Sequence, residues 1–301
     1  MNRKRDVVLI TGANGNLAKA VSNYLSKYYV VRHLTSSKKT SSKSDYFFWD
    51  VGKEYLDIKA LENCSHIVHL AGYPILKKWN EKNKKIMYDS RVKSTNLIFK
   101  TCQAHNFEPK TFICASAIGI YNQNTKEINE DSPKANDWIG NMAADWEDSA
   151  NQFQKIGSRV VQMRFSLIFS QSGGFLKYTL LSMKYGLGLI IGNRKRKIYW
   201  MHTHDISRFI KKSISSYNYK GPYNMIADQA LSQEEFFIKL KKKLFSYCIN
   251  IRIPMFLIKL FLGKRSQIIN SDITLENKRL RTLGFRCNIN NLDDLINNLK
   301  Q

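Results

Sequence analysis

Acidic residues are scarce in this sequence. Of its 301 residues, 48 are Lys or Arg and only 24 are Asp or Glu, so the formal net charge is +24. A charge of this size is typical of proteins that bind nucleic acid or anionic membranes. However, 34 Lys, 26 Asn and 30 Ile make up close to a third of the chain, and an A/T-rich coding sequence produces the same bias. The charge therefore indicates either a binding surface or compositional drift.

Cysteines are few, and they are scattered along the chain. The five are Cys64, Cys102, Cys114, Cys248 and Cys287, an odd number without the Cys-x-x-Cys or His-partnered spacing of a metal site. This pattern argues against a disulfide framework and against zinc. We therefore expect a reduced, cytoplasmic protein without a bound metal.

A long hydrophobic run is missing as well. The longest apolar stretch, residues 251–262, contains Arg252 and Lys259 and is too short to span a bilayer. The apolar run at 6–10 is too short for the hydrophobic region of a signal peptide. At 43% hydrophobic and 12% aromatic residues, the chain can still bury a full core, which excludes global disorder.

Short apolar runs alternate with helical patterns in the first half of the chain. This alternation predicts an α/β fold with a Rossmann-like, doubly wound parallel sheet. After about residue 170 the pattern loosens into irregular helices, which predicts a smaller C-terminal α+β lobe. The expected strands lie at 7–10, 30–34, 67–70, 110–115 and 160–168, and the expected helices at 17–28, 84–105, 140–155, 176–185, 204–217, 233–244, 254–262 and 292–300.

A glycine-rich motif, Gly-Ala-Asn-Gly-Asn-Leu-Ala at 12–18, follows the first expected strand and opens the first expected helix. Gly12 allows a tight turn, Gly15 lets the backbone approach a pyrophosphate, and Ala18 replaces the third glycine that eases helix–strand packing. Free amides at the helix start would hold phosphate oxygens. The motif favours a dinucleotide site over a turn without a ligand. The expected contacts are Gly12, Asn14, Gly15, Asn16 and Leu17.

The end of the second expected strand bears on the choice of cofactor. An acidic residue there would bind the ribose 2′-hydroxyl of NAD, whereas basic groups favour NADP. This chain has Arg32, Ser36 and Lys38 in the region and no acid before Asp45. We therefore expect NADP, with contacts from Ser36 and Lys38, although NAD stays open because the chain is rich in lysine throughout.

Together these motifs resemble the extended short-chain dehydrogenases/reductases of the NAD(P)-dependent epimerase/dehydratase family. The closer resemblance is to an epimerase-like branch with a short C-terminal domain of unknown function, whose members are often named nucleoside-diphosphate-sugar epimerases. It implies an NAD(P)-binding domain at 1–228, with 170–200 contributing to the substrate lobe, and a C-terminal substrate-lobe domain at 229–301. The matching blocks are 11–18, 69–75, 78–80, 90–95, 116–121, 146–147, 186–188, 200–205, 221–224 and 283–285.

The resemblance also implies roles for individual residues. Asp50 would lie near the adenine, Arg91 would approach the cofactor phosphates, and residues 70–72 would lie beside the adenosine. Arg91 could instead be one more surface cation, and the basic run 194–197 either holds an anionic substrate or forms an exposed loop. The implied cofactor contacts are Asp50, Leu70, Ala71, Gly72, Arg91, Leu167 and Ile168, and the implied substrate contacts are Trp79, Arg194, Arg196 and His202.

The family's Tyr-x-x-x-Lys pair is absent. Ile139 and Ala143 stand at the matching positions, and neither can transfer a proton. Ser116 lies one residue before the usual Ser/Thr position. The remaining catalytic candidates are Ser116 and Tyr121, and Tyr121 could equally be an aromatic residue that packs under the nicotinamide.

Three hypotheses follow for the function. The first is an NADP-dependent oxidoreductase or epimerase-like enzyme that transfers a hydride on a small substrate, phosphorylated or linked to a nucleotide. The second is a non-catalytic NADP-binding protein that regulates or binds a partner. The third, ranked last, is a charge-driven nucleic-acid or membrane-surface binder, because no nucleic-acid motif is present. We expect a monomer or homodimer with no membrane span and no specific nucleic-acid partner.

Overall fold

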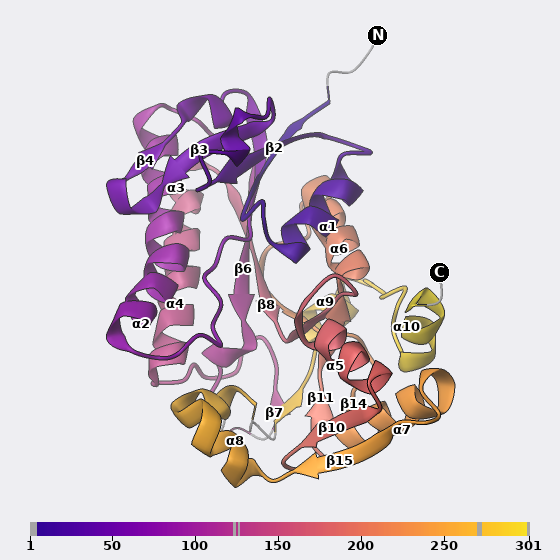
Figure 1. Ribbon diagram of the computed structural model, residues 1–301. Coiled ribbons are helices and arrows are strands. Elements are labelled where there is room, and N and C mark those ends of the chain that lie inside the picture. The colour runs from indigo at the N-terminus through magenta and orange to yellow at the C-terminus, as the bar shows by residue number, and fades with distance from the viewer. Residues whose placement is uncertain (1–4, 123–124, 126, 270–272, 300–301) are drawn as a thin grey trace.

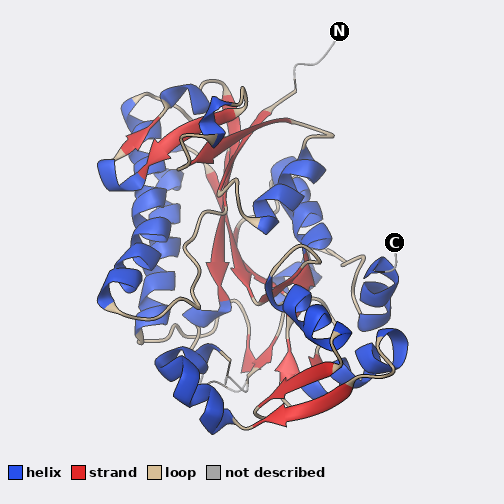
Figure 2. Ribbon diagram, viewed as in Figure 1, coloured by secondary structure: helices blue, strands red, loops and turns tan. Residues whose placement is uncertain are grey.

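A large, mostly parallel sheet runs through the molecule (Figures 1 and 2). The computed structural model describes residues 5–122, 125, 127–269 and 273–299. The strand order is β13-β8-β6-β5-β1-β2-β3-β4, and only β4 runs antiparallel to its neighbour. The chain thus starts in the middle of the sheet and winds to both sides, which confirms the doubly wound α/β fold. The strands are β1 (Val7–Thr11), β2 (Val30–Thr35), β3 (Tyr46–Asp50), β4 (Tyr55–Leu56), β5 (Cys64–His69), β6 (Thr111–Ala117), β8 (Arg159–Phe165) and β13 (Gly221–Met225).

Helices cover both faces of this sheet, which is why its central strands bury apolar side chains on both faces. Every residue of β1 is buried. Val8 and Ile10 pack toward α1 and α6, whereas Leu9 packs on the other face with Ile98 of α3, because successive side chains alternate. The helices are α1 (Asn16–Leu25), α2 (Glu81–Tyr88), α3 (Ser94–Ala104), α4 (Trp138–Asn151), α5 (Gly174–Lys184), α6 (Thr203–Ser215), α7 (Gln233–Leu244), α8 (Met255–Leu262), α9 (Lys278–Thr282) and α10 (Leu292–Leu299).

Two expected elements are interrupted. The single helix expected at 84–105 is divided into α2 and α3 by a π-helical segment, Asp89–Lys93. The strand expected at 160–168 leaves the sheet at Ser166, whose hydroxyl donates to the carbonyl of Met225. The chain then continues as β9, which pairs with β12 instead of with the large sheet.

The C-terminal lobe combines α5, α7 and α10 with several short strand pairs, at the end of the molecule opposite the amino terminus (Figure 1). Its core includes Phe169, whose ring lies 4.8 Å from that of Trp200 and 5.8 Å from that of Phe236. None of the described helices is long and apolar enough to cross a membrane. The short strands are β7 (Glu127–Ile128), β9 (Leu167–Phe169), β10 (Leu187–Ile191), β11 (Lys197–Ile198), β12 (Trp200–His202), β14 (Leu231–Ser232), β15 (Ile249–Ile253) and β16 (Thr274–Leu275).

Candidate functional site

The loop between β1 and α1 lies where the strand order reverses direction, which is where open α/β sheets bind ligands. Gly12 has φ +74°, and a Cβ there would lie 3.1 Å from backbone atoms of Leu70 and Ala71. A Cβ on Gly15 would lie 3.1 Å from the carbonyl oxygen of Gly12. Gly15 begins α1 without a side-chain cap. The loop therefore leaves the first amides of α1 available to an anion.

Three buried side chains hold this loop against the end of β5. The Thr11 hydroxyl accepts hydrogen bonds from the amides of Leu70 and Ala71, each at 3.0 Å. Its proton is therefore directed to Nδ1 of His69 at 2.8 Å, which leaves the proton of His69 on Nε2, 3.1 Å from the Ser94 hydroxyl. Burial lowers the pKa of His69 to about 3, so the ring is neutral near neutral pH. This chain fixes residues 70–72 beside the glycine loop.

Arg91 lies inside the π-helical segment, and its side chain reaches Gly72 and Tyr73 beside the glycine loop. Its guanidinium donates to the carbonyls of Tyr73 and Met87, and it stacks over Trp146 at 5.3 Å. A Cβ on Gly72 would lie 3.3 Å from the guanidinium carbon. Burial lowers the pKa of Arg91 to about 10, and within the described residues no carboxylate pairs with it. A half-buried cation without a carboxylate partner lacks a counter-ion, and a bound phosphate would supply one.

The residues expected to read the ribose are exposed at the end of β2. Ser36 and Lys38 lie on the loop after β2, and the Lys38 ammonium lies 5.9 Å from the Phe48 ring centre. Arg32 does not join them, because its guanidinium donates to the carbonyls of Lys59, Ala60 and Glu62. Asp50 ends β3, where one carboxylate oxygen accepts from the amides of Gly52 and Lys53.

A buried ion pair lies at the end of β6. The Ser116 hydroxyl donates to Glu147 Oε1 at 2.7 Å. Arg164 donates to both carboxylate oxygens, from Nε at 2.7 Å and from Nη2 at 2.8 Å. Both charged side chains are about 5% exposed. Burial alone would lower the pKa of Arg164. The hydrogen bonds to Glu147 and the charge of Glu147 outweigh this effect, so the pKa of Arg164 is raised. Ser116 is thus held by a carboxylate inside a closed network.

Tyr121 belongs to the same network. It is 1% exposed, its hydroxyl donates to Asn224 Oδ1 at 2.6 Å, and it accepts from Arg164 Nη1 at 2.8 Å. Burial raises the pKa of Tyr121 to about 12, against the charge of Arg164, which lowers it. Both hydrogen-bonding positions of the hydroxyl are therefore occupied by protein groups.

Helix α4 presents apolar side chains at the two positions where the resemblance leads one to expect a Tyr and a Lys. Ile139 and Ala143 are both buried, and a Cβ on Gly119 would come within 2.8 Å of the Ile139 side chain. The face of α4 that points to the end of β6 is therefore filled by packing. The next polar residue along that face is Glu147, one turn beyond Ala143.

Other expected site residues also come together on neighbouring elements. Leu167 and Ile168 lie on β9, directly beside β12, whose last residue is His202. A Cβ on Gly173, in the turn after β9, would overlap the Asn16 amide, so this turn lies against the glycine loop. His202 accepts from the amide of His204 at the start of α6, and burial lowers its pKa to about 4.

The remaining expected substrate residues lie apart from this group. Trp79 donates to the carbonyl of Ile75, and its ring lies 5.3 Å from that of Trp138 at the start of α4. Arg194 is exposed, and it pairs with Glu234 at 3.3 Å. Arg196 lies in the same turn before β11. The basic run is thus a surface loop of the C-terminal lobe with a carboxylate beside it.

Three residues of the site were not expected from the sequence. Arg164 lies 17 residues from Glu147, and Asn224 lies on the far edge strand, so no local spacing connects them. Tyr88, at the end of α2, packs with Val92 and Trp146 beside the end of β6, and its pKa is raised by burial and by a hydrogen bond to Asp145. No sequence signal distinguished Tyr88 from the other tyrosines of the chain.

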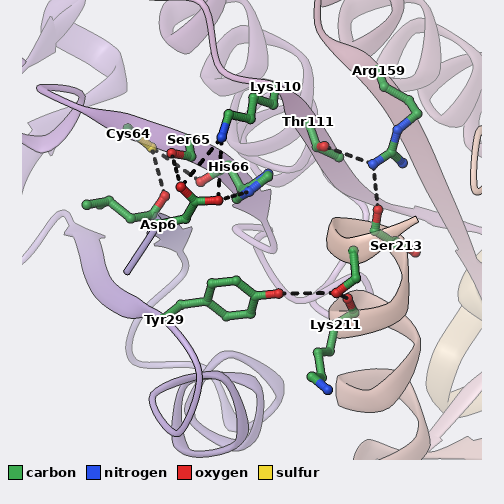
Figure 3. A network of polar contacts seen from close by, with 12 residues as sticks. Asp6, Tyr29, Cys64, Ser65, His66, Lys110, Thr111, Arg159, Lys211 and Ser213 are labelled. Atoms are coloured by element: carbon green, nitrogen blue, oxygen red, sulfur yellow. Dashed lines mark hydrogen bonds and ion pairs between the residues drawn. The ribbon is translucent and has the colours of Figure 1, made fainter. Parts of the chain in front are cut away.

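A second polar cluster lies at the opposite edge of the sheet, where the strands begin (Figure 3). Asp6 accepts from Ser65 at 3.2 Å and lies 3.5 Å from the Lys110 ammonium. Arg159 donates to Thr111 Oγ1 and to the carbonyl of Ser213, which joins β6 to the end of α6. A cavity of about 300 Å³ is bordered by four of these residues, Asp6, Lys110, Thr111 and Arg159. The cluster is separate from the glycine loop, because parallel strands place their two ends on opposite edges.

Known proteins are similar to this chain over most of its length. The profile of the NAD dependent epimerase/dehydratase family matches residues 8–226. An epimerase family protein of Staphylococcus haemolyticus is 30% identical over 297 residues, which cover 96% of this chain and 98% of that protein. The crystal structure of the human epimerase family protein SDR39U1 (isoform 2) with NADPH has a TM-score of 0.83 at 22% identity, over 96% of this chain and 97% of that one.

A second solved structure is a short-chain dehydrogenase/reductase superfamily protein of Agrobacterium tumefaciens with bound NAD. Its TM-score is 0.73 at 17% identity, over 97% of this chain and 95% of that one. At such identities the two structural matches show a shared fold.

Proposed function

Because the chain belongs to the NAD dependent epimerase/dehydratase family, we propose that it binds NADP(H) and acts as an oxidoreductase or epimerase-like enzyme on a small substrate. The observation that carries this proposal is the glycine loop, where side chains are excluded at Gly12 and Gly15 and the first amides of α1 lack a side-chain cap. This is the arrangement that accepts a pyrophosphate at a helix start.

The surroundings of the loop fit a dinucleotide. The amides of Asn16 and Leu17 would hold the pyrophosphate, whereas the Gly15 amide already donates to the carbonyl of Gly12 at 2.8 Å. Arg91 would supply a positive charge, since it has no carboxylate partner in the described part of the chain. Asp50 keeps one carboxylate oxygen that the two loop amides do not use, which is available to the adenine amino group. Residues 70–72, Leu167 and Ile168 would line the adenosine and nicotinamide sides.

The choice of NADP over NAD rests on the loop after β2. Ser36 and Lys38 are exposed there, with no acid until Asp45, so a 2′-phosphate would meet a cation and a hydroxyl instead of a carboxylate. Removal of the Lys38 charge should therefore weaken NADPH binding more than NADH binding.

A bound nicotinamide would donate or accept a hydride at C4. The protein must then handle the proton without the usual Tyr and Lys. We propose that Ser116, whose only proton is donated to Glu147, orients a substrate hydroxyl by accepting its hydrogen bond, and that Tyr121 is a positioning residue, because Arg164 and Asn224 already occupy its hydroxyl. His202, close to β9 and the glycine loop, would contact the substrate, and Trp79, Arg194 and Arg196, which lie on other elements, would be outer contacts.

Ligand-induced stabilisation tests the cofactor proposal. NADPH at about 100 times its dissociation constant should stabilise the fold by about 2.7 kcal/mol, seen as a rise in the midpoint of thermal unfolding. Arg91→Met should reduce that rise. Lys93→Met is the matched control, since Lys93 lies in the same segment but is exposed and pairs with Asp89 at 3.2 Å. If neither NADPH nor NADH shifts the midpoint, the proposal is wrong.

A second candidate is a cofactor-binding protein without turnover. The specific observation in its favour is that Ser116 and Tyr121 are both hydrogen-bonded inside the protein, while Ile139 and Ala143 fill the usual catalytic face. NADPH absorbance measured against a panel of carbonyl compounds and sugar nucleotides separates the two. Stabilisation by NADPH with no substrate-dependent absorbance change across the panel would favour the second candidate.

A further inference from the structure

Helix α8 is apolar and largely uncovered. Its sequence, Met-Phe-Leu-Ile-Lys-Leu-Phe-Leu, contains one charged residue, and none of its eight residues is buried. Phe256 and Leu260 are four residues apart and therefore lie on the same side of the helix. They are 67% and 76% exposed, and Phe261 is 76% exposed. Large apolar side chains are usually this exposed together only where something else covers them.

A second apolar surface adjoins α8. Strands β10 and β15 pair in parallel, with Leu187 opposite Ile249 and Leu189 opposite Ile251. The other face of this pair turns inward, because a Cβ on Gly188 would contact Phe237 of α7. Leu187, Ile249 and Ile251 are therefore on the outer face, where all three are exposed. We call Leu187, Ile249, Ile251, Phe256, Leu260 and Phe261 the apolar patch.

The two parts of the patch are neighbours in space. Strand β15 ends at Ile253, and Pro254 leads directly into α8. At the end of β10, a Cβ on Gly192 would lie 3.2 Å from the sulfur of Met255. The patch thus occupies the end of the C-terminal lobe, away from the amino terminus (Figure 1).

The chain around the patch contains cations and no acids. Residues 236–271 include eight basic residues and neither Asp nor Glu, and residues 149–204, which contain β10, are also free of acids. With 24 acidic residues in the chain, acid-free stretches of this length are unusual for this sequence. Of the eight basic residues at 236–271, Arg252, Lys259, Lys264 and Arg265 lie on β15, on α8 or in the turn after it, beside the patch. The other four, Lys239, Lys241, Lys242 and Lys243, lie on α7, whose first turn contains Glu234 and Glu235 and which packs on the inner face, and Lys239 pairs with Asp293 at 2.9 Å.

We propose that the apolar patch docks the protein on the surface of an anionic lipid bilayer. Apolar side chains that enter the interface, with cations beside them that attract anionic headgroups, are the two features that such binding needs. A helix of eight residues is about 12 Å long, far shorter than the hydrocarbon core, so it would lie in the interface and not span it.

Charge favours a lipid surface over a second copy of the chain. An isologous dimer would bring two copies of the same acid-free segment together, and like charges across an interface are unfavourable. Anionic headgroups would instead neutralise it. The proposal is independent of cofactor binding, since the glycine loop is not part of the patch.

Vesicle sedimentation tests the proposal. The full chain should sediment with phosphatidylcholine vesicles that contain about 30 mol % phosphatidylglycerol but not with pure phosphatidylcholine, and high salt should weaken the binding. Phe256→Ser with Leu260→Ser should lower the partition constant about tenfold or more. Tyr55→Ser with Ile58→Ser is the matched control, because these two side chains are also exposed, at 50% and 41%, but lie outside the patch.

Folding and self-association are checked on the same variants. A cooperative thermal-unfolding transition close to that of the wild-type chain reports that the patch variant is folded, and light scattering after gel filtration reports its oligomeric state. The proposal is overturned if the anionic vesicles do not bind the protein, or if both double variants lose binding equally. It is also overturned if the wild-type chain is a dimer that the patch variant dissociates, since a second copy then covers the patch.

Discussion

The buried pair of Glu147 and Arg164 allows a quantitative prediction. Glu147 is 4% exposed and accepts three hydrogen bonds, two from Arg164 and one from Ser116. Glu147→Gln keeps the shape but removes the charge, and its amide group would face a guanidinium that can only donate. Loss of one partner of a buried ion pair costs about 3–5 kcal/mol, because the other charge stays buried and uncompensated. We expect a loss of stability of that size.

Urea denaturation near neutral pH measures the loss. The midpoint should fall while the slope of free energy against urea stays unchanged, because the surface exposed on unfolding is the same. Asp148→Asn is the control. It makes the same chemical change one residue later on α4, but Asp148 is 67% exposed and lies 3.9 Å from Lys134, so its effect should stay below about 1 kcal/mol.

A double variant tests the cause. Glu147→Leu combined with Arg164→Met removes both charges, and replacement of a buried pair by apolar residues is often close to neutral. Arg164 also donates to Tyr121 and to the carbonyl of Glu130, so about 1–3 kcal/mol should remain lost. The reasoning is refuted if Glu147→Gln costs less than about 1 kcal/mol, or if the double variant is as unstable as the sum of its two single variants.

Three further predictions concern other parts of the molecule. The pKa of His69 is about 3 in the folded protein against 6.5 when unfolded, so the unfolded state takes up the proton first and stability falls as pH drops through this range. By about pH 4 the loss should reach about 3 kcal/mol, and His69→Asn should flatten the acid limb of a urea-midpoint profile. Gly12→Ala should destabilise the fold and abolish stabilisation by NADPH in thermal unfolding. Gly157→Ala, at a similar φ of +78° but with nothing within 4 Å, should cost about 1 kcal/mol and leave the NADPH effect unchanged. Ser232→Ala removes the capping box of α7 and should cost about 1 kcal/mol in urea denaturation, and Ser232→Gly only a few tenths.

The elements that the sequence predicted well are those with local signals. The first strand, glycine loop and helix were readable because β-branched residues, two glycines and an amphipathic helix follow one another within about twenty residues. The loop's position at the reversal of the sheet followed from the alternation of strands and helices. The family resemblance, which the profile match confirms, extended this to residues 70–72 and Arg91 as neighbours of the loop.

The parts that the sequence did not predict depend on contacts between distant residues. Strand β10 pairs in parallel with β15 about sixty residues later, so no hairpin turn between them could indicate the pairing. In the sequence, Arg164 looks like an ordinary polar residue of a strand. Its ion pair with Glu147 of α4 forms only when the fold places the two elements side by side. The role of Tyr121 could not be assigned from the sequence. Whether its hydroxyl is free to bind a substrate depends on Asn224, which belongs to the distant edge strand β13.

Because of the π-helical segment Asp89–Lys93, the position of Arg91 depends on the number of residues between α2 and α3. A π turn holds one residue more than an α turn, and such turns are frequent at functional positions. Deletion of one residue here would let the helix run straight, and every residue before the deletion would rotate by about 100° about its axis. Arg91 would then leave Gly72, while α3 and its buried face could stay in place. Relatives that are one residue shorter between α2 and α3 should therefore have no cation beside the residue that matches Gly72, even where an Arg is present in that segment. A gap at this point of an alignment would then indicate a changed site.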